Sequence, residues 1–347
     1  MIPFTRPLIP TMDEIMPFYQ ASLDANHMSN FGPCFTAAVS GLKQRTGGFP
    51  LPVSNGTVAI SVALRTLLGP KMGLRVAVPD FTCVATLMAI VQAGMRPVLV
   101  DCHESTMAVN PYTLIESRDR YDAFVVVSPF GYAVDFKFYE RISLMLSKPL
   151  VFDLAGAWGI DTKDITSPYT YSFHATKNFS IGEGGAVVFQ SDKDWQRAKQ
   201  LINFDMDDNK SSQSQWGLNG KLDEIHCAMI CAHLSQHDRI EHRIKDKVNL
   251  TKIYENRIPC KINHGYYGGA PSMAVLSGVQ PDIMIKAARS KVFASRKYYS
   301  PLISKMDGLR GSVERLGICG EYFETFLALP TGVDAGELDR ILNDLGV

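Results

Sequence analysis

Lys177 is the residue whose type and position point most directly to chemistry. It closes residues 172–177 (SFHATK), which begin in a predicted buried strand, and the turn-rich run 182–185 (GEGG) follows soon after. Burial lowers the pKa of a lysine, and the neutral amine can then attack a carbonyl carbon and form a Schiff base. Two structural explanations of these residues remain possible. A lone lysine in a loop is usually a solvated surface residue, and His174 alone is more often a core histidine than a catalyst.

Two further segments carry an acid and a turn of the kind that binds phosphate. Asp153 ends the apolar run PLVFD, and a carboxylate at the buried end of a strand needs a partner. It could cap the next helix or hold the protonated ring nitrogen of a cofactor. Residues 54–57 (SNGT) precede a predicted helix, where glycine lets a ligand approach the backbone and free N–H groups favour a phosphate. A simple N-cap is the alternative, since Ser, Asn and Thr all cap helices.

The three segments together predict a pyridoxal phosphate (PLP) site. A phosphate cradle, a carboxylate for the pyridine nitrogen and a lysine for the Schiff base are what this cofactor needs from a protein. The interval between Asp153 and Lys177 leaves room for a short crossover and one further strand. Ligands of parallel α/β sheets bind beyond the carboxyl ends of the strands, where these residues are expected.

The surrounding pattern predicts an α/β fold. Short apolar runs such as AFVVVS alternate with helix-like segments, and these runs are apolar on both faces, as in strands that helices cover on both sides. We therefore predict a mainly parallel sheet with right-handed crossovers. The predicted strands are 75–79, 97–101, 122–128, 149–153, 170–174 and 186–190, and the predicted helices are 57–68, 86–93 and a long one over 221–242.

The pattern changes after about Trp195, and short strands and helices mix in the last part of the chain. We predict a large domain over residues 1–245 and a smaller α+β domain over residues 246–347.

Composition excludes several classes of protein. The chain is 46% hydrophobic and 20% charged, with 35 basic and 35 acidic residues. This balance argues against a nucleic-acid or membrane-surface partner. No apolar run approaches the roughly 20 residues of a membrane span, and the N-terminus lacks a signal-peptide pattern. The seven cysteines are scattered, so we expect reduced thiols in a soluble cytoplasmic protein. Cys227 and Cys231 lack a second ligand pair, so we expect core cysteines and no metal.

The sequence resembles the DegT/DnrJ/StrS sugar aminotransferase family of fold-type I PLP enzymes, over nearly the whole chain. The SFHATK…EGGA block is its most specific part. The resemblance implies a large domain built on a mainly parallel seven-stranded sheet. The matching blocks are SNFGPCF at 29–35, SNGTVAISVAL, VPDFTCVATLMAIVQAGMRPVLVD, PFGYAVD, VFDLAGAWG, YSFHATKNFSIGEGGAVVF, GLNGKLDEIHCAM at 217–229, RKYYSPL at 296–302 and LALP at 327–330.

The resemblance also implies roles for individual residues. Lys177 would bind PLP covalently and move the proton between substrate and cofactor, and Asp153 would keep the ring nitrogen protonated. Asn219 matches an asparagine that reaches the phosphate from the neighbouring subunit, which implies a homodimer with a shared active site. The remaining matches are Gly56, Thr57 and Ser172 at phosphate-binding positions, Cys83 and Gly156 beside the cofactor ring, and Phe31, Glu183 and Tyr299 near the substrate.

Two of these positions depart from the family pattern. Cys83 stands where the family usually has an aromatic ring that stacks on the cofactor, and a thiol offers a softer contact. Gly156 stands where the family usually has His or Gln against the ring hydroxyl. Both departures predict weaker cofactor binding unless Phe81, Trp158 or His174 compensates.

The predicted function is transfer of an amino group from glutamate to a nucleotide-linked, dTDP-type 4-keto- or 3-keto-6-deoxy sugar. A sugar dehydratase of the same family is a first alternative, although such enzymes typically replace the lysine with histidine. A non-catalytic paralogue, which binds ligand or serves as a partner subunit, is a second, motivated by Cys83 and Gly156. A PLP-binding transcription regulator would need an appended basic DNA-binding module, which this sequence does not suggest.

Overall fold

A sheet of eight strands organises the protein. The computed structural model describes residues 1–207, 209–261, 269–309 and 311–347. The strand order is β1-β7-β6-β5-β4-β2-β3-β10, and all strands of this sheet run in one direction except β7, which runs in the opposite direction. The strands are β1 (Phe49–Val53), β2 (Arg75–Pro79), β3 (Arg96–Val100), β4 (Ala123–Val127), β5 (Leu150–Asp153), β6 (Tyr169–Ser172), β7 (Gly185–Phe189) and β10 (Glu314–Arg315).

The six predicted strands are confirmed, with ends that shift by at most two residues. Strand β1 was not among them, because its sequence FPLPV contains two prolines, which cannot donate ladder hydrogen bonds. The strand is tolerated because it lies at the edge of the sheet. The mainly parallel seven-stranded sheet is confirmed by β1 to β7. The two residues of β10 extend it from a distant part of the chain, alongside β3.

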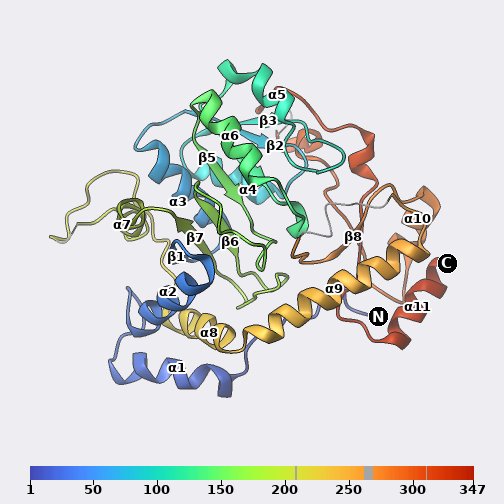
Figure 1. Cartoon of the computed structure of the whole chain (residues 1–347), viewed down its shortest axis with the longest axis horizontal. Helices are drawn as coiled ribbons and strands as arrows, with labels where there is room; N and C mark the ends of the chain where they lie inside the picture. Colours follow the sequence, from blue (N-terminus) through green and yellow to red (C-terminus); the bar gives the residue numbers. More distant parts are fainter. Residues whose placement is uncertain (208, 262–268, 310) are drawn as a thin grey trace.

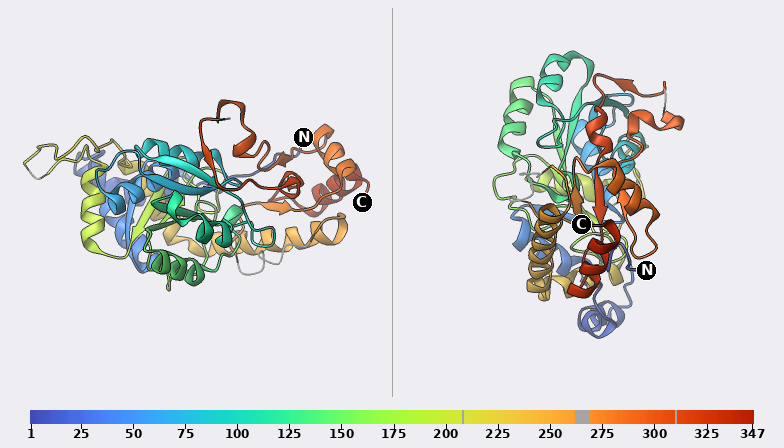
Figure 2. Two further views of the ribbon diagram at one scale, coloured as in Figure 1. Left: turned by 90° about the horizontal axis from the view of Figure 1, so that it is seen from above. Right: turned by 90° about the vertical axis from the view of Figure 1, so that its right-hand side faces the viewer.

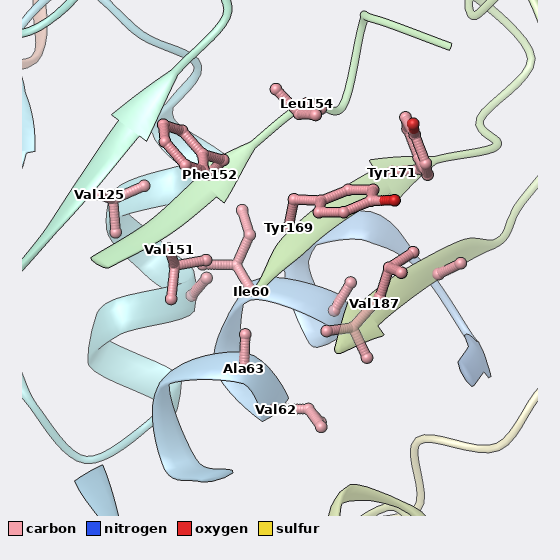
Figure 3. Packing of buried hydrophobic residues seen from close by; sticks show 14 of the residues in the cluster. Ile60, Val62, Ala63, Val125, Val151, Phe152, Leu154, Tyr169, Tyr171 and Val187 are labelled. Carbon is pink, nitrogen blue, oxygen red and sulfur yellow. The ribbon is translucent and has the colours of Figure 1, made fainter. Parts of the chain in front are cut away.

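Helices cover the sheet, as Figure 1 shows. Every residue from Ala59 to Leu64 of α3 is buried. Figure 3 shows Ile60 of α3 facing Val151 of β5 and Tyr169 of β6. This packing holds the beginning of α3 near the carboxyl ends of the strands. The helices are α1 (Met12–Asp24), α2 (Pro33–Thr46), α3 (Gly56–Leu68), α4 (Val84–Gln92), α5 (Pro111–Glu116), α6 (Phe136–Leu146), α7 (Asp192–Leu201), α8 (Glu224–Ser235), α9 (His237–Arg257), α10 (Pro281–Arg289) and α11 (Ala335–Leu345).

The single helix predicted over residues 221–242 is wrong. The structure has two helices, α8 and α9, which meet at Gln236. The amide of Gln236 bonds the carbonyl of His233 only three residues back, which closes α8 with a tight turn. Asp238 then lies in the first turn of α9, where a negative charge favours a helix start. The apolar pattern is continuous across this break, so periodicity alone does not reveal it.

Helix α9 leads from the large sheet to a second, three-stranded sheet of order β8-β11-β9. Its strands are β8 (Ala274–Leu276), β9 (Arg296–Lys297) and β11 (Leu327–Leu329). Ile2 pairs with Phe293, so the N-terminus lies beside this C-terminal part, as Figure 2 shows. The division of the chain at residue 245, which falls inside α9, stays a prediction. Within the described ranges, no helix is long and apolar enough to cross a membrane.

Candidate active site

Asp153 is the last residue of β5, at the carboxyl end of the parallel strands. Its side chain is buried and accepts hydrogen bonds from the Thr86 hydroxyl (2.8 Å) and the Ala155 amide (3.0 Å). No α-helix starts directly after it, so Asp153 is not the helix cap considered from the sequence. Burial raises the pKa of Asp153, although both hydrogen bonds and the nearby Lys177 oppose the shift. A cationic N–H group placed against this carboxylate would favour its charged form.

Lys177 lies in the turn after β6 and is half-buried. Burial lowers the pKa of Lys177, while the charges of Asp153 and Cys83 oppose the shift. Within the described part of the chain, no hydrogen bond or ion pair engages its Nζ atom. The structure therefore presents an amine that is partly desolvated, is not held by a protein partner and lies within electrostatic reach of a buried carboxylate.

The beginning of α3 meets the ends of two strands. A Cβ atom on Gly56 would lie 2.9 Å from the Cβ atom of Ser172, and one on Gly185 would lie 2.7 Å from the Asn55 backbone. Only glycine allows both approaches. The Asn55 side chain caps α3 through the Val58 amide. The amides of Gly56 and Thr57 have no partner in the described part of the chain, so they are available to an anion.

Tyr299 forms a wall of the site together with Phe130. The two rings are stacked, with centroids 5.1 Å apart and an angle of 13° between planes. Burial raises the pKa of Tyr299 well above its ordinary value, and nearby Cys83 and Asp153 act in the same direction. The phenol thus stays a neutral hydrogen-bond donor within reach of the Asp153 charge.

Gly156 lies in a filled space and not in an open one. A Cβ atom there would lie 3.1 Å from Ser272 Oγ, 3.2 Å from the Phe130 carbonyl carbon and 3.3 Å from the Gly131 nitrogen. The position where the resembling family carries a His or Gln is therefore closed by two other segments of this chain. Cys83, in contrast, is exposed at the start of α4.

Two of the three side chains that could replace the missing cofactor contacts, Phe81 and Trp158, are packed in buried clusters. Phe81 is fully buried in an aromatic cluster, where it packs edge-on against Tyr299. Trp158 packs against Phe179 in the core, with ring centroids 4.3 Å apart. His174 remains at the site, half-buried, with its Nδ1 atom 2.9 Å from the Thr176 hydroxyl.

Charged and imidazole groups of His174, Glu183 and His226 form a partly exposed rim near Lys177. Glu183 has an exposed side chain whose Oε1 atom lies 3.6 Å from His174 Nε2. The hydrogen bond that His226 Nδ1 donates to the Asp223 carboxylate raises the pKa of His226, and the charge of Glu183 adds to this effect. Such a rim can donate to and accept from hydroxyl groups.

Two predicted residues lie apart from this group. Asn219 is exposed, and its Oδ1 atom accepts a hydrogen bond from Lys221 Nζ (2.9 Å). Its neighbour Gly220 accepts a hydrogen bond from the Ser54 amide (2.9 Å), which places the segment beside the predicted phosphate turn. Phe31 packs under the Lys199 ammonium, 4.8 Å from the ring centroid. No described contact of this single chain joins either side chain to Lys177.

The structure also reveals residues that sequence reasoning missed. Thr86, which bonds Asp153, lies three residues after Cys83, in the first turn of α4. A helix predicted to begin at Cys83 would have placed both side chains on one face, next to the site. Lys247 is buried on α9 in one stripe with Ile240, Thr251 and Tyr254. A lysine at a core position of a helix indicates a buried amine that needs partners, but the helix predicted from the sequence ended at residue 242, before Lys247.

A model of the DegT/DnrJ/EryC1/StrS aminotransferase family matches residues 14–262 of the chain. The Mycobacterium tuberculosis protein Rv3402c is 30% identical over 252 residues, which are 69% of this chain and 61% of that protein. The chain thus spans less than two thirds of the length of this relative. The dTDP-4-amino-4,6-dideoxy-D-glucose transaminase of Escherichia coli is 27% identical over 97% of this chain and 95% of that enzyme.

Solved structures share the fold over almost the entire chain. DesI, crystallised in the presence of its TDP-sugar product, superposes with a TM-score of 0.85 at 21% identity, over 98% of this chain and 91% of DesI. NtdA from Bacillus subtilis, with bound PMP, has a TM-score of 0.83 at 20% identity, over 99% of this chain and 85% of NtdA. The predicted fold class is confirmed by these likenesses.

Proposed function

We propose, since this chain belongs to the DegT/DnrJ/EryC1/StrS aminotransferase family, that it transfers an amino group from glutamate to a nucleotide-linked keto-sugar. Members of this family are PLP-dependent enzymes, as predicted from the sequence. The observation that carries the proposal is that the Lys177 amine, half-buried and not bonded by any described residue, lies within electrostatic reach of the buried Asp153 carboxylate, beside the glycine-dependent turn at Gly56.

The residues present fit the cofactor. The amides of Gly56 and Thr57 and the hydroxyl of Ser172 would hold its phosphate, and Asp153 would face its ring nitrogen. Bound PLP would supply an electron sink for the carbon that exchanges its amino group. Lys177 would hold the cofactor until the amino group of the donor displaces it, and the freed Lys177 amine would then take a proton from one carbon and return it to another. Burial favours the neutral form of Lys177, which this proton transfer requires.

The substrate class is part of the proposal. The Escherichia coli relative aligns almost end to end and acts on a dTDP-linked 4-amino-4,6-dideoxy sugar. We therefore propose a dTDP-linked 4-keto- or 3-keto-6-deoxy sugar as amino acceptor. The partly exposed rim of His174, Glu183 and His226 supports this class, because sugar hydroxyls need both donors and acceptors. Tyr299 would bound the sugar on an apolar side.

A homodimer with shared active sites completes the proposal. Asn219 is exposed and has only Lys221 as a hydrogen-bond partner among the described residues, so it is available to the phosphate of a second subunit. Mixing Asn219→Ala with Lys177→Ala protein tests this directly. Mixed dimers would hold one site with both lesions and one intact site, so activity should return on mixing. A monomer by light scattering would contradict the shared site.

The test of the function itself uses the purified protein with PLP. Covalent attachment at Lys177 should give a visible absorbance band, glutamate should bleach it, and a dTDP-4-keto-6-deoxy sugar should restore it with formation of an amino sugar, detected by mass spectrometry. A band that glutamate leaves unchanged would favour the non-catalytic alternative. The filled space around Gly156 weakens that alternative, since the lost side chain is replaced by packed chain and not by a gap.

A further inference from the structure

A second lysine is buried behind the turn that carries Lys177. Lys247 of α9 is 2% exposed, and its Nζ atom donates hydrogen bonds to Asn178 Oδ1 (2.7 Å) and the Ser272 carbonyl (2.6 Å). A buried amine is costly unless it is hydrogen-bonded. Burial lowers the pKa of Lys247 well below its ordinary value, and the charges of Arg243 and Lys177 act in the same direction. Both acceptors are neutral carbonyl oxygens, so a neutral amine satisfies them as well.

The two acceptors belong to segments that meet at the candidate site. Asn178 directly follows Lys177, and its Nδ2 atom donates to the carbonyls of Ala270 (3.2 Å) and Pro271 (3.0 Å). The amide of Ser272 donates to the Phe130 carbonyl (2.8 Å).

This second segment also closes the space at Gly156. Ser272 Oγ would be 3.1 Å from a Cβ atom on Gly156, and the Ala270 amide bonds the Gly131 carbonyl (2.9 Å). Residues 270–272 therefore contact the Lys177 turn on one side and the loop that contains Gly156 on the other.

We propose that Lys247 is a positioning residue for Lys177, because its amine ties the Lys177 turn to the segment that closes the space at Gly156. This inference rests on the proposed attachment of the cofactor at Lys177. Without the Lys247 amine, the oxygens of Asn178 and Ser272 lose a donor in a buried place, which favours separation of the two segments or entry of water. Either outcome moves the Lys177 amine relative to Asp153, and a displacement of about 1 Å at a reacting group can cost about 100-fold in rate.

The experiment compares Lys247→Met with Lys245→Met, since Lys245 is exposed on the same helix. Holoprotein is stripped of cofactor and remixed with PLP, and covalent attachment at Lys177 is followed by borohydride trapping and peptide mass spectrometry. Total bound PLP and the thermal midpoint of the apoprotein are measured in parallel. We expect Lys247→Met to slow attachment on the order of 10- to 100-fold while most PLP binding remains. We expect Lys245→Met to match the unmodified protein.

Further variants keep the test decisive if Lys247→Met does not fold. Lys247→Arg keeps donors at this position, and Asn178→Ala removes one of the two acceptors. We expect Lys247→Arg to attach PLP faster than Asn178→Ala, and kcat of Asn178→Ala to fall more than its KM changes. Equal attachment rates in these variants and in the unmodified protein would overturn the positioning role. Failure of the unmodified protein to attach PLP at Lys177 would instead refute the proposed function.

Discussion

Two walls of the candidate site are built in different ways. The strand-end wall, formed by Asp153, Ser172 and Lys177, consists of residues at the ends of β5 and β6 or in the turn just after β6. The C-terminal wall, formed by Ser272 and Tyr299, consists of irregular chain packed against Phe130. Sheet hydrogen bonds fix the first wall, whereas ring stacking and close backbone contacts shape the second.

The two walls also differ in how closely they follow the family pattern. The strand-end wall keeps the expected residues, and the proposed chemistry would require an amine, a carboxylate and a hydroxyl at these positions. The C-terminal wall faces the two departures, Cys83 and Gly156. At one of them the C-terminal wall fills the space, because Ser272 lies against Gly156. A wall that only needs to fill space, such as the one at Gly156, can be formed by other segments of the chain. A wall that must present an amine and a carboxylate needs those particular side chains.

The largest effect is expected from Lys177→Ala in the strand-end wall. No other described side chain takes its place between the turn and Asp153, so covalent attachment of PLP and turnover should be abolished while the fold survives. Borohydride trapping, activity assays and the thermal midpoint measure these outcomes, with Lys245→Ala as control. Retained turnover would contradict the role of Lys177 in attaching PLP and would make the buried amine of Lys247 the next candidate.

Asp153→Asn should leave PLP bound but reduce turnover by about 10²–10³-fold, the usual size of effect for one lost preorganised electrostatic contact. The reason is that an amide does not stabilise a protonated ring nitrogen. The Asp153 charge also raises the pKa of Lys177, so the variant should have a lower Lys177 pKa. In apoprotein, the rate of Lys177 acetylation should therefore stay high to lower pH. An unchanged pH profile together with near-normal turnover would leave Asp153 only a structural role.

Gly156→His probes the C-terminal wall and should destabilise it. The new side chain would enter a space already bounded by Ser272 Oγ and the backbone of residues 130–131, and overpacking typically costs about 1–3 kcal/mol. We expect a lower urea midpoint and weaker PLP binding. Gly308→Ala is the matched control, since nothing lies within 4 Å of a Cβ atom there. Tighter PLP binding in Gly156→His would mean that Ser272 and residues 130–131 can move apart to admit the new side chain at little cost in free energy.

The smallest effect is expected from Cys83→Phe. This position is exposed, so a ring has room to stack on the cofactor. Ring stacking contributes about 0.5–1.5 kcal/mol beyond area burial, which corresponds to PLP binding that is roughly 2- to 12-fold tighter. Equilibrium titration of apoprotein with PLP measures it. Expulsion of the cofactor would show that Tyr299 already occupies the face that the new ring needs.

The sequence by itself determined the strands β2 to β7, the helix at Gly56 and the placement of Asp153 and Lys177 at neighbouring strand ends, within electrostatic reach of each other. These features depend on local information: apolar periodicity, turn residues, and the position of a polar residue at the end of a strand. The family resemblance rests on the same segments, because the reactive residues must follow the strands that present them.

Only the tertiary structure decided how the remaining space is used. The filled position at Gly156, the approach of Tyr299 to Asp153 and the Lys247–Asn178 bond each join segments that are far apart in the chain. The break at Gln236 was hidden because the apolar pattern continues across it. The edge strands β1 and β10 were hidden because each depends on pairing with a strand far away in the chain, β7 for β1 and β3 for β10. Their conformations are set by neighbours in space, and residue periodicity carries no information about which distant backbone will lie within 3–4 Å of a given atom.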